Sequence, residues 1–450
     1  MLITCILFTS LVQAQNFTAL EEYVRLGLRN NHQLIRDQLD TEIQRQVVLE
    51  AKGKYLPDIF LDASYTRADG GRLITVPAGD LINPAYEGLN QVVGTDEFPT
   101  NIPNINEQLL PDDFHETKIR LIQPILNTDI YYNRMAQEAQ LSAREAKLRA
   151  YQNQLIKQIK VAYYQHLSAQ EQVRILITTR DILEEVVRVS KKQVANDKAT
   201  KEVIYGAQAE LSKLESQIAS AEKQEKVSRI FFNYLISREL EEEIIGESNK
   251  GMDAIPISSK ESLTTAAIGA RNELKQIDYG LQATRANTLL TKSYVVPEVS
   301  LVGDIGFQGF GYTFDSNQDF IFLRIGLTWP IFQGNQNKAK IQQSVLREKQ
   351  LESQLEETRD LISLEVAEAY YAYEEALKTL AASQSELRNA EENFRIIQKK
   401  YVQNQVIQVA FNDARNTFTT SQLQEVISWY NLKIKQAELE AATAFNDFQN

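Results

Sequence analysis

No glycine or proline occurs from Asn335 to Asn450, which is about a quarter of the chain. A second run without either residue extends from Ile125 to Tyr205. Glycine and proline are the strongest helix breakers, and helices of globular proteins average about a dozen residues. Runs of this length therefore predict extended helices that pack as coiled coils.

Both runs carry a narrow apolar seam, whose positions alternate in steps of four and three residues. The seam extends from Ile362 to Tyr401 in the second run and from Leu155 to Val194 in the first. Such a 3.5-residue period is typical of left-handed coiled coils. A helix of roughly 70 residues would be about 105 Å long, more than a compact domain can contain. We therefore expect long helices that pack along one seam and leave their other faces in water.

The chain also repeats one plan at about half its length, which indicates a duplication. The sequence Ala162-Tyr163-Tyr164 returns as Ala369-Tyr370-Tyr371, and Lys191–Asn196 returns in pattern as Lys399–Asn404. Two segments that contain proline, 54–59 and 121–126, return as 294–299 and 327–332. The expected repeats cover residues 15–247 and 248–450, each with the order helix, strand, loop, strand, long helix and further helix. The expected helices cover about 17–54, 127–238, 259–294 and 335–448.

Four segments alternate apolar and polar residues with the period of two that β-strands show. These strands are expected at about 56–67, 115–125, 297–309 and 318–331. A half-buried sheet in water and a membrane β-barrel share this alternation. Four strands cannot close a barrel within one chain, and open sheet edges are not tolerated in lipid. A membrane interpretation therefore requires several chains that contribute strands to one barrel.

The segment from about Ala68 to Asp113, between the first two strands, is rich in Gly, Pro, Asn and Asp and has weak periodicity. It is predicted to be a long loop, and loops of this length are usually functional or mobile. Its counterpart in the second repeat, about 309–318, is short.

Residues 1–14 are expected to be a signal peptide, because the apolar stretch Leu2–Val12 is followed by Ala14 at a position suited to cleavage. A buried N-terminal segment is the alternative. The only cysteine, Cys5, lies in this stretch, so the mature chain would contain no disulfide. The chain carries 48 Lys and Arg against 60 Asp and Glu, a net charge of -12 that disfavours nucleic acid as a partner.

The duplicated order of these motifs, with proline at the strand edges and Ala-Tyr-Tyr in the long helices, resembles the TolC-type outer-membrane efflux proteins from about Phe17 to Phe448. The resemblance implies a homotrimer in which each chain gives four strands to a 12-stranded transmembrane β-barrel. The long helices would form a hollow α-barrel that crosses the periplasm. The implied function is a passive exit duct of a tripartite efflux or type I secretion system in the outer membrane of a Gram-negative bacterium. Its partners would be a periplasmic adaptor, an inner-membrane pump and outer-membrane lipid.

The resemblance also implies a gate at the periplasmic turns between the helices. Asn404 and Asn196 stand where the family prefers glycine, and asparagine tolerates a left-handed backbone. Asp413 and Glu202 stand at acidic positions of the family's tips, where rings of carboxylates would attract cations. Tyr401, at the end of the seam, is interpreted as a packing residue more than as a gate.

If the strands face as their alternation predicts, six charged residues would line the barrel lumen and keep it hydrated: Asp58, Asp62, Lys118, Arg120, Asp304 and Arg324. No catalytic site, metal site or cofactor is expected. The three histidines, His32, His115 and His166, do not form a metal-binding pair in the sequence, and His166 lies on the seam as a packed residue.

Two alternatives remain open at this point. One is a periplasmic coiled-coil adaptor or scaffold without its own membrane barrel, although adaptors usually carry one helical hairpin and this chain carries two. The other is a soluble coiled-coil regulator, which the predicted signal peptide disfavours. Fractionation of membranes distinguishes both alternatives from a trimeric channel.

Overall fold

The computed structural model describes residues 18–246, 259–403 and 405–445. The predicted signal peptide and the boundary between the expected repeats lie outside these residues. The fold is mainly helical with a small β part in a duplicated order, and this confirms the predicted fold class. Two compact units form: a sheet unit, residues 47–137 and 284–346, and a helical unit that contains the rest. Each unit draws on both halves of the chain, so neither corresponds to one sequence repeat.

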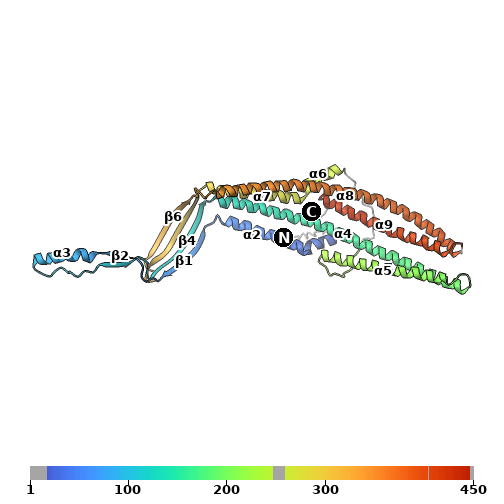
Figure 1. Ribbon diagram of the computed structural model, residues 1–450, viewed down its shortest axis with the longest axis horizontal. Coiled ribbons are helices and arrows are strands. Elements are labelled where there is room, and N and C mark those ends of the chain that lie inside the picture. Colours follow the sequence, from blue (N-terminus) through green and yellow to red (C-terminus); the bar gives the residue numbers. More distant parts are fainter. Residues whose placement is uncertain (1–17, 247–258, 404, 446–450) are drawn as a thin grey trace, which may run out of the picture. The chain divides into compact units, whose positions relative to one another are not determined.

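The sheet unit contains an antiparallel sheet of four strands in the order β1-β4-β5-β6 (Figure 1). The strands are β1 (Asp58–Thr66), β4 (Phe114–Leu126), β5 (Glu298–Phe310) and β6 (Asp319–Thr328). The register between β4 and β5 shifts between Pro124 and Leu126. Proline has no N–H for a strand ladder, and an irregularity of this kind accommodates it. β1 and β6 are the edge strands of this sheet.

Between β1 and β4 the prediction of a long loop is wrong. The segment contains β2 (Leu73–Val76), α3 (Ala78–Val93) and β3 (Ile105–Gln108), with β2 and β3 paired antiparallel. Several of its glycines, prolines and asparagines lie within α3, among them Asn83, Pro84 and Gly88, and others flank or end these elements. Gly94, for example, ends α3 in the left-handed conformation that glycine adopts without strain.

The helical elements come in two similar sets. The first comprises α1 (Ala19–Asn30), α2 (His32–Gly53), α4 (Thr128–Ala195) and α5 (Glu202–Leu235). The second comprises α6 (Lys260–Ala270), α7 (Asn272–Lys292), α8 (Gln336–Val402) and α9 (Gln408–Ala442). A short 3₁₀ turn, η1 (Ser293–Val295), leads from α7 into β5. The hairpins α4–α5 and α8–α9 each reverse at a short turn (Figure 1).

The predicted seam is the buried side of the long helices. On α4 it buries Leu155, Ile159, Ala162, His166, Leu183 and Ser190; on α8 it buries Ile362, Val366, Tyr373, Ala376, Leu380 and Phe394. His166 is 1% exposed, as expected for a packed residue. In the first set the seam of α4 packs with α1 and α5 around Tyr23, Tyr163 and Phe232. The narrow seam therefore forms a thin apolar core between helices whose other faces are polar.

In each set one residue separates the first two helices, and both of these residues form the same kind of hydrogen bond. Asn31 ends α1, accepts hydrogen bonds from the N–H groups that begin α2, and donates its Nδ2 to the carbonyl of Leu235 at 3.0 Å. Arg271 ends α6 and donates Nη1 to the carbonyl of Ala442 at 3.1 Å. Leu235 and Ala442 are the last residues of α5 and α9. Each break therefore satisfies a carbonyl that a helix end would otherwise leave without a partner.

Candidate functional site

The four-stranded sheet exposes its aliphatic face. The register places Leu61, Ile119, Ile305 and Ile321 in one row across the four strands. Their exposed fractions are 70%, 50%, 56% and 82%. Leu323, Ile325 and Leu327 continue this face along β6 and are exposed to a similar degree. A sheet that folds in water buries this kind of face, because large exposed aliphatic patches are costly.

The opposite face of the sheet carries the charges. Arg120 forms a bidentate ion pair with Asp304, with Nε–Oδ1 at 2.7 Å and Nη2–Oδ2 at 2.8 Å. Lys118 lies 2.6 Å from Glu116 and 3.7 Å from Asp62. Lys118 and Asp304 are only 6% and 5% exposed. Lys118 and Asp304 are thus sheltered while the aliphatic side chains of the other face are exposed, the reverse of the pattern in a water-soluble sheet.

The register places all six predicted lumen residues on this charged face. Asp58 and Arg324 occupy one row, Asp62 and Lys118 a second, and Arg120 and Asp304 a third. The structure therefore brings together Asp62 with Lys118 and Arg120 with Asp304. That this face lines a lumen stays a prediction.

Gly306 on β5 makes room for this charged network. A Cβ at this position would lie 2.2 Å from the carbonyl oxygen of Thr117 and 2.5 Å from the Cα of Lys118, which pairs with Gly306 across the ladder. Any side chain would therefore push β4 and β5 apart.

Aromatic rings gather at the end of the sheet where β5 turns into β6. Tyr65, Phe307, Phe310, Tyr312 and Phe314 all make ring contacts there, with centroids between 4.9 and 5.6 Å apart. The same turn covers His115, whose Nε2 lies 2.9 Å from Oε1 of Gln318. At the other end Trp329 and Phe332 are exposed. Exposed aromatic residues that flank an aliphatic band on both sides are typical of membrane-spanning β-strands.

The first helical turn differs from the prediction in one detail. α4 ends at Ala195, and the left-handed residue is Asp197, with φ of 56°, instead of Asn196. The N–H of Lys198 bonds to the carbonyl of Gln193 at 2.8 Å, the closing bond of a Schellman motif. Asn196 instead donates its side chain to the carbonyl of Lys192. The prediction that Asn196 takes the left-handed conformation was therefore wrong by one position, because aspartate, like asparagine, tolerates this conformation.

The second turn shows the same closing bond, from the N–H of Gln405 to the carbonyl of Lys400 at 2.8 Å. Asn404, the predicted glycine substitute, lies outside the described residues. Tyr401 is 8% exposed and stacks on Phe411 with ring centroids 4.6 Å apart, so it packs the turn as expected. Gln408 donates its side-chain amide to the carbonyl of Val203, which joins the two turns.

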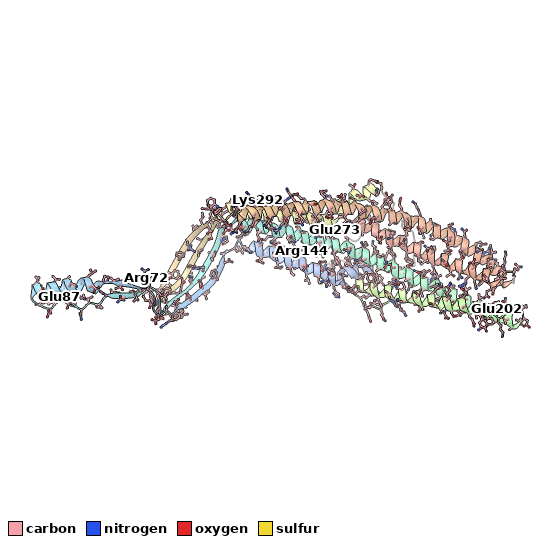
Figure 2. All side chains as sticks on the ribbon, viewed as in Figure 1. Arg72, Glu87, Arg144, Glu202, Glu273 and Lys292 are labelled. Carbon is pink, nitrogen blue, oxygen red and sulfur yellow. The ribbon has the colours of Figure 1, made fainter. Side chains whose placement is uncertain are left out.

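The two predicted acidic residues are exposed. Glu202 is the first residue of α5, at the turn between α4 and α5 (Figure 2), and a hydrogen bond with the side chain of Thr200 lowers the pKa of its carboxyl. Asp413 lies on the second turn of α9 with its side chain in solvent. Within the described residues, no hydrogen bond or ion pair joins Glu202 to Asp413.

Sequence reasoning missed a charged pair beneath these turns. Arg415 is 3% exposed, and its Nη2 lies 3.0 Å from Oε2 of Glu210 on α5. Burial lowers the pKa of the Arg415 guanidinium, which Glu210 opposes. The available signal was the spacing of Phe411, Ala414 and Phe418, because Arg415 lies within the apolar face that these residues define.

Within the described residues, no group of His, Cys, Asp or Glu side chains has the arrangement of a metal site. No described helix combines the length and the apolar character that crossing a membrane requires.

Comparison with known proteins agrees with this geometry. Residues 263–444 match the family of outer membrane efflux proteins. No curated protein sequence matches the chain. The fold is similar to the Campylobacter jejuni outer membrane channel CmeC, with 16% identity and a TM-score of 0.78 over 96% of this chain and 87% of CmeC.

It is also similar to the outer membrane protein VceC of Vibrio cholerae, with 15% identity and a TM-score of 0.74 over 94% of this chain and 95% of VceC. For the open state of the Neisseria gonorrhoeae MtrE outer membrane channel the identity is 16% and the TM-score 0.74, over 94% of this chain and 88% of MtrE. At these identities the structures establish the fold. Together with the family match over residues 263–444, they confirm the resemblance to the TolC-type outer-membrane efflux proteins.

Proposed function

We propose that three copies of this chain form an outer-membrane exit duct. The four-stranded sheet, which exposes its aliphatic face and carries charges on the opposite face, supports this most directly; we call it the inverted sheet. Its aliphatic face suits lipid, and its charged face suits a hydrated lumen. The edge strands β1 and β6 each pair with one neighbour among the described residues. Lipid does not tolerate unpaired edges, so β6 of one copy would pair with β1 of the next and close a 12-stranded barrel.

The long helices would continue this duct into the periplasm of a Gram-negative cell. α4 and α8 contain 68 and 67 residues, which correspond to about 100 Å each. We expect a periplasmic adaptor and an inner-membrane pump as partners. The duct itself would be passive, because transport through a hydrated lumen of this kind requires no chemistry from its wall.

Membrane fractionation combined with sizing tests the proposal. The protein should sediment with the outer membrane, run as a detergent-resistant trimer and conduct ions in planar bilayers. A soluble monomer would support the alternative of a periplasmic adaptor or scaffold without a barrel and would end the channel proposal.

We propose further that the helical turns gate the duct at its periplasmic end, with Asp413 and Glu202 contributing acidic rings and Tyr401, Asn196 and Asn404 shaping the turns. Three copies of an exposed carboxylate near a threefold axis would attract cations and repel one another.

Asp413→Asn should therefore reduce block by divalent cations in single-channel recordings by roughly threefold or more while trimer yield stays the same. Glu222→Gln, which removes an exposed carboxylate of α5 away from the turn, is the matched control. Equal block in the wild type and Asp413→Asn would remove the gating role of Asp413.

A further inference from the structure

The segment between β1 and β4, residues 68–113, carries an apolar surface that nothing in the described chain covers. On α3, Leu81, Leu89, Val92 and Val93 are 71%, 44%, 85% and 54% exposed. At 100° per residue these side chains, together with the small residues Ala85 and Gly88, form one continuous arc of the helix. We call this surface the α3 arc.

The other side of α3 is already occupied, so the segment cannot turn the arc inward. Asn83 exchanges two hydrogen bonds of 2.8 Å with the backbone of Ile102, and Asn90 exchanges two with the backbone of Phe98. Tyr86 packs on Phe98 with ring centroids 5.4 Å apart. These contacts fix the segment 98–104 along α3.

Gly79 shows how close this contact is. A Cβ there would lie 2.2 Å from the carbonyl oxygen of Ile102. α3 is therefore held in one orientation, with the arc directed away from the segment 98–104. A fixed apolar face on a helix of 16 residues needs a partner.

The charge of the segment decides against an anionic membrane surface as that partner. Residues 68–113 contain eight Asp and Glu residues but only one basic residue, Arg72. Helices that lie on membranes carry Lys and Arg on their polar face, whereas α3 carries only Asp80 and Glu87 as charged residues. Figure 2 labels Glu87 on this helix.

A second copy of the chain fits the arc better. Leu81, Ala85, Gly88 and Val92 alternate in steps of four, three and four, the spacing of a coiled-coil seam. Ala85 and Gly88 in the middle of this seam permit a close approach of helices. Asp80 and Glu87 lie on the opposite side of α3, so their charges do not meet in such a contact.

The position of the segment in the chain brings second copies within reach. It begins where the edge strand β1 ends, and β1 is one of the two strands that pair with a neighbouring copy in the proposed barrel. We propose that the three α3 helices of the trimer pack together through their arcs and form a helical crown at the outer mouth of the duct. This inference rests on the proposed trimer and adds to it an interface that the barrel does not require.

Cysteine trapping tests the crown. In a Cys5→Ser background, which removes the only cysteine, Val92→Cys places a thiol on the arc and Gln91→Cys places one beside it on the polar side. Cells are treated with a trifunctional maleimide, and the outer-membrane protein is analysed on denaturing gels. We expect a covalent trimer from Val92→Cys at a yield roughly tenfold above that from Gln91→Cys, because the packed arcs hold their thiols at high effective concentration.

A second variant separates packing from mere proximity. Leu81→Asp in the Val92→Cys background adds three carboxylates to the shared contact and should abolish trapping while the detergent-resistant trimer persists. Glu87→Gln in the same background should leave trapping unchanged.

The outcomes distinguish the crown from the duct. A trimer that resists detergent but gives equal trapping at positions 91 and 92, or none at either, overturns the crown and leaves the duct intact. A chain that forms no trimer overturns both. A fluorophore attached to the thiol of the Val92→Cys variant reports on lipid. Its quenching by spin-labelled lipids would mean that lipid covers the arc, and this also overturns the crown.

Discussion

Among the buried charges of the described residues, Arg415 forms an ion pair with a single carboxylate, that of Glu210. Arg415 is almost fully buried, whereas 29% of the side-chain surface of Glu210 is exposed. Loss of one partner from a buried pair costs most when the partner left behind cannot reach water. The two possible truncations should therefore differ in their effect on stability.

Glu210→Gln should lower the free energy of unfolding by about 3 kcal/mol, because it leaves the Arg415 guanidinium buried and unpaired. Arg415→Met should cost less, about 1 kcal/mol, because Glu210 can hydrate and the methionine fills the apolar site. Denaturant unfolding of the purified protein, monitored by circular dichroism, measures both values. A larger loss in Arg415→Met than in Glu210→Gln would contradict this assignment.

His166 should give the helical unit a sensitivity to acid. Burial lowers the pKa of its imidazole below the usual 6.5, although Glu225 raises it in part. Nδ1 lies 3.2 Å from the hydroxyl of Ser228, and Arg229 on the same helix also opposes protonation. The unfolded chain therefore binds a proton at His166 more readily than the folded chain does.

The contribution of His166 to the free energy of unfolding therefore has its full value above pH 6.5. It decreases as the pH falls below 6.5, by at most about 1.4 kcal/mol per pH unit for one proton. His166→Gln should unfold at a temperature that changes less between pH 7.5 and pH 5. Thermal unfolding of the two proteins at both pH values checks this. An identical pH dependence in both would show that other groups cause it.

At the scale of elements, the pairing of β4 with β5 depends on a glycine. Gly306→Ala should reduce the yield of outer-membrane trimer by roughly tenfold, since its Cβ would meet the backbone of β4 and separate the strands. Gly303→Ala is the matched control, because its Cβ would meet only a side-chain atom of Leu323 at 3.7 Å. Quantitative blotting of outer-membrane fractions gives the comparison. Equal yields would mean that the strands adjust more easily than their close approach implies.

In each helix set one polar residue, located between the first two helices, donates a hydrogen bond to the end of the last helix. Asn31 and Arg271 differ in size and charge, yet both reach the final carbonyl of the returning helix. Arg271 is also paired with Glu273 and Glu365. The duplication has therefore preserved a hydrogen bond to a helix end while the residue that donates it has changed.

At the scale of the whole molecule, the inverted sheet predicts where a charge is tolerated. Leu323→Arg places a cation on the aliphatic face and should destabilise insertion by about 2–4 kcal/mol if that face meets lipid. Gln308→Arg adds the same cation to the charged face and should have little effect. The fraction of trimer recovered from the outer membrane distinguishes the two. Equal recovery of both variants would contradict the assignment of the faces.

Much of this organisation could be predicted from local pattern. The seam from Leu155 to Val194 and the alternation around Ile59 and Leu61 reflect a helix period and a strand period, and both appear directly in the sequence. The register then placed Asp304 and Arg120 on one face of the sheet. Alternation along one strand could indicate their facing but could not pair them.

The misses arose where local rules permit several outcomes. Residues 68–113 were expected to form a loop because Gly, Pro and Asn usually mark turns, yet Asn83 and Asn90 bind the backbone of Ile102 and Phe98 and order α3. The left-handed residue of the first turn was displaced from Asn196 to Asp197, since both residue types suit that conformation. No prediction was made for Arg415, because its burial depends on a partner on another helix.

The sequence alone determined the periods: where helices run without a break, where strands alternate, and that the plan occurs twice. These features depend on covalent geometry and on residues a few positions apart, so they need no knowledge of distant contacts. Only the tertiary structure decided which face of the sheet is exposed and which charges meet, because strand register and helix packing join residues far apart in the chain. The exposed aliphatic face and the ion pairs of the opposite face, on which the proposed duct rests, belong to this second kind of information.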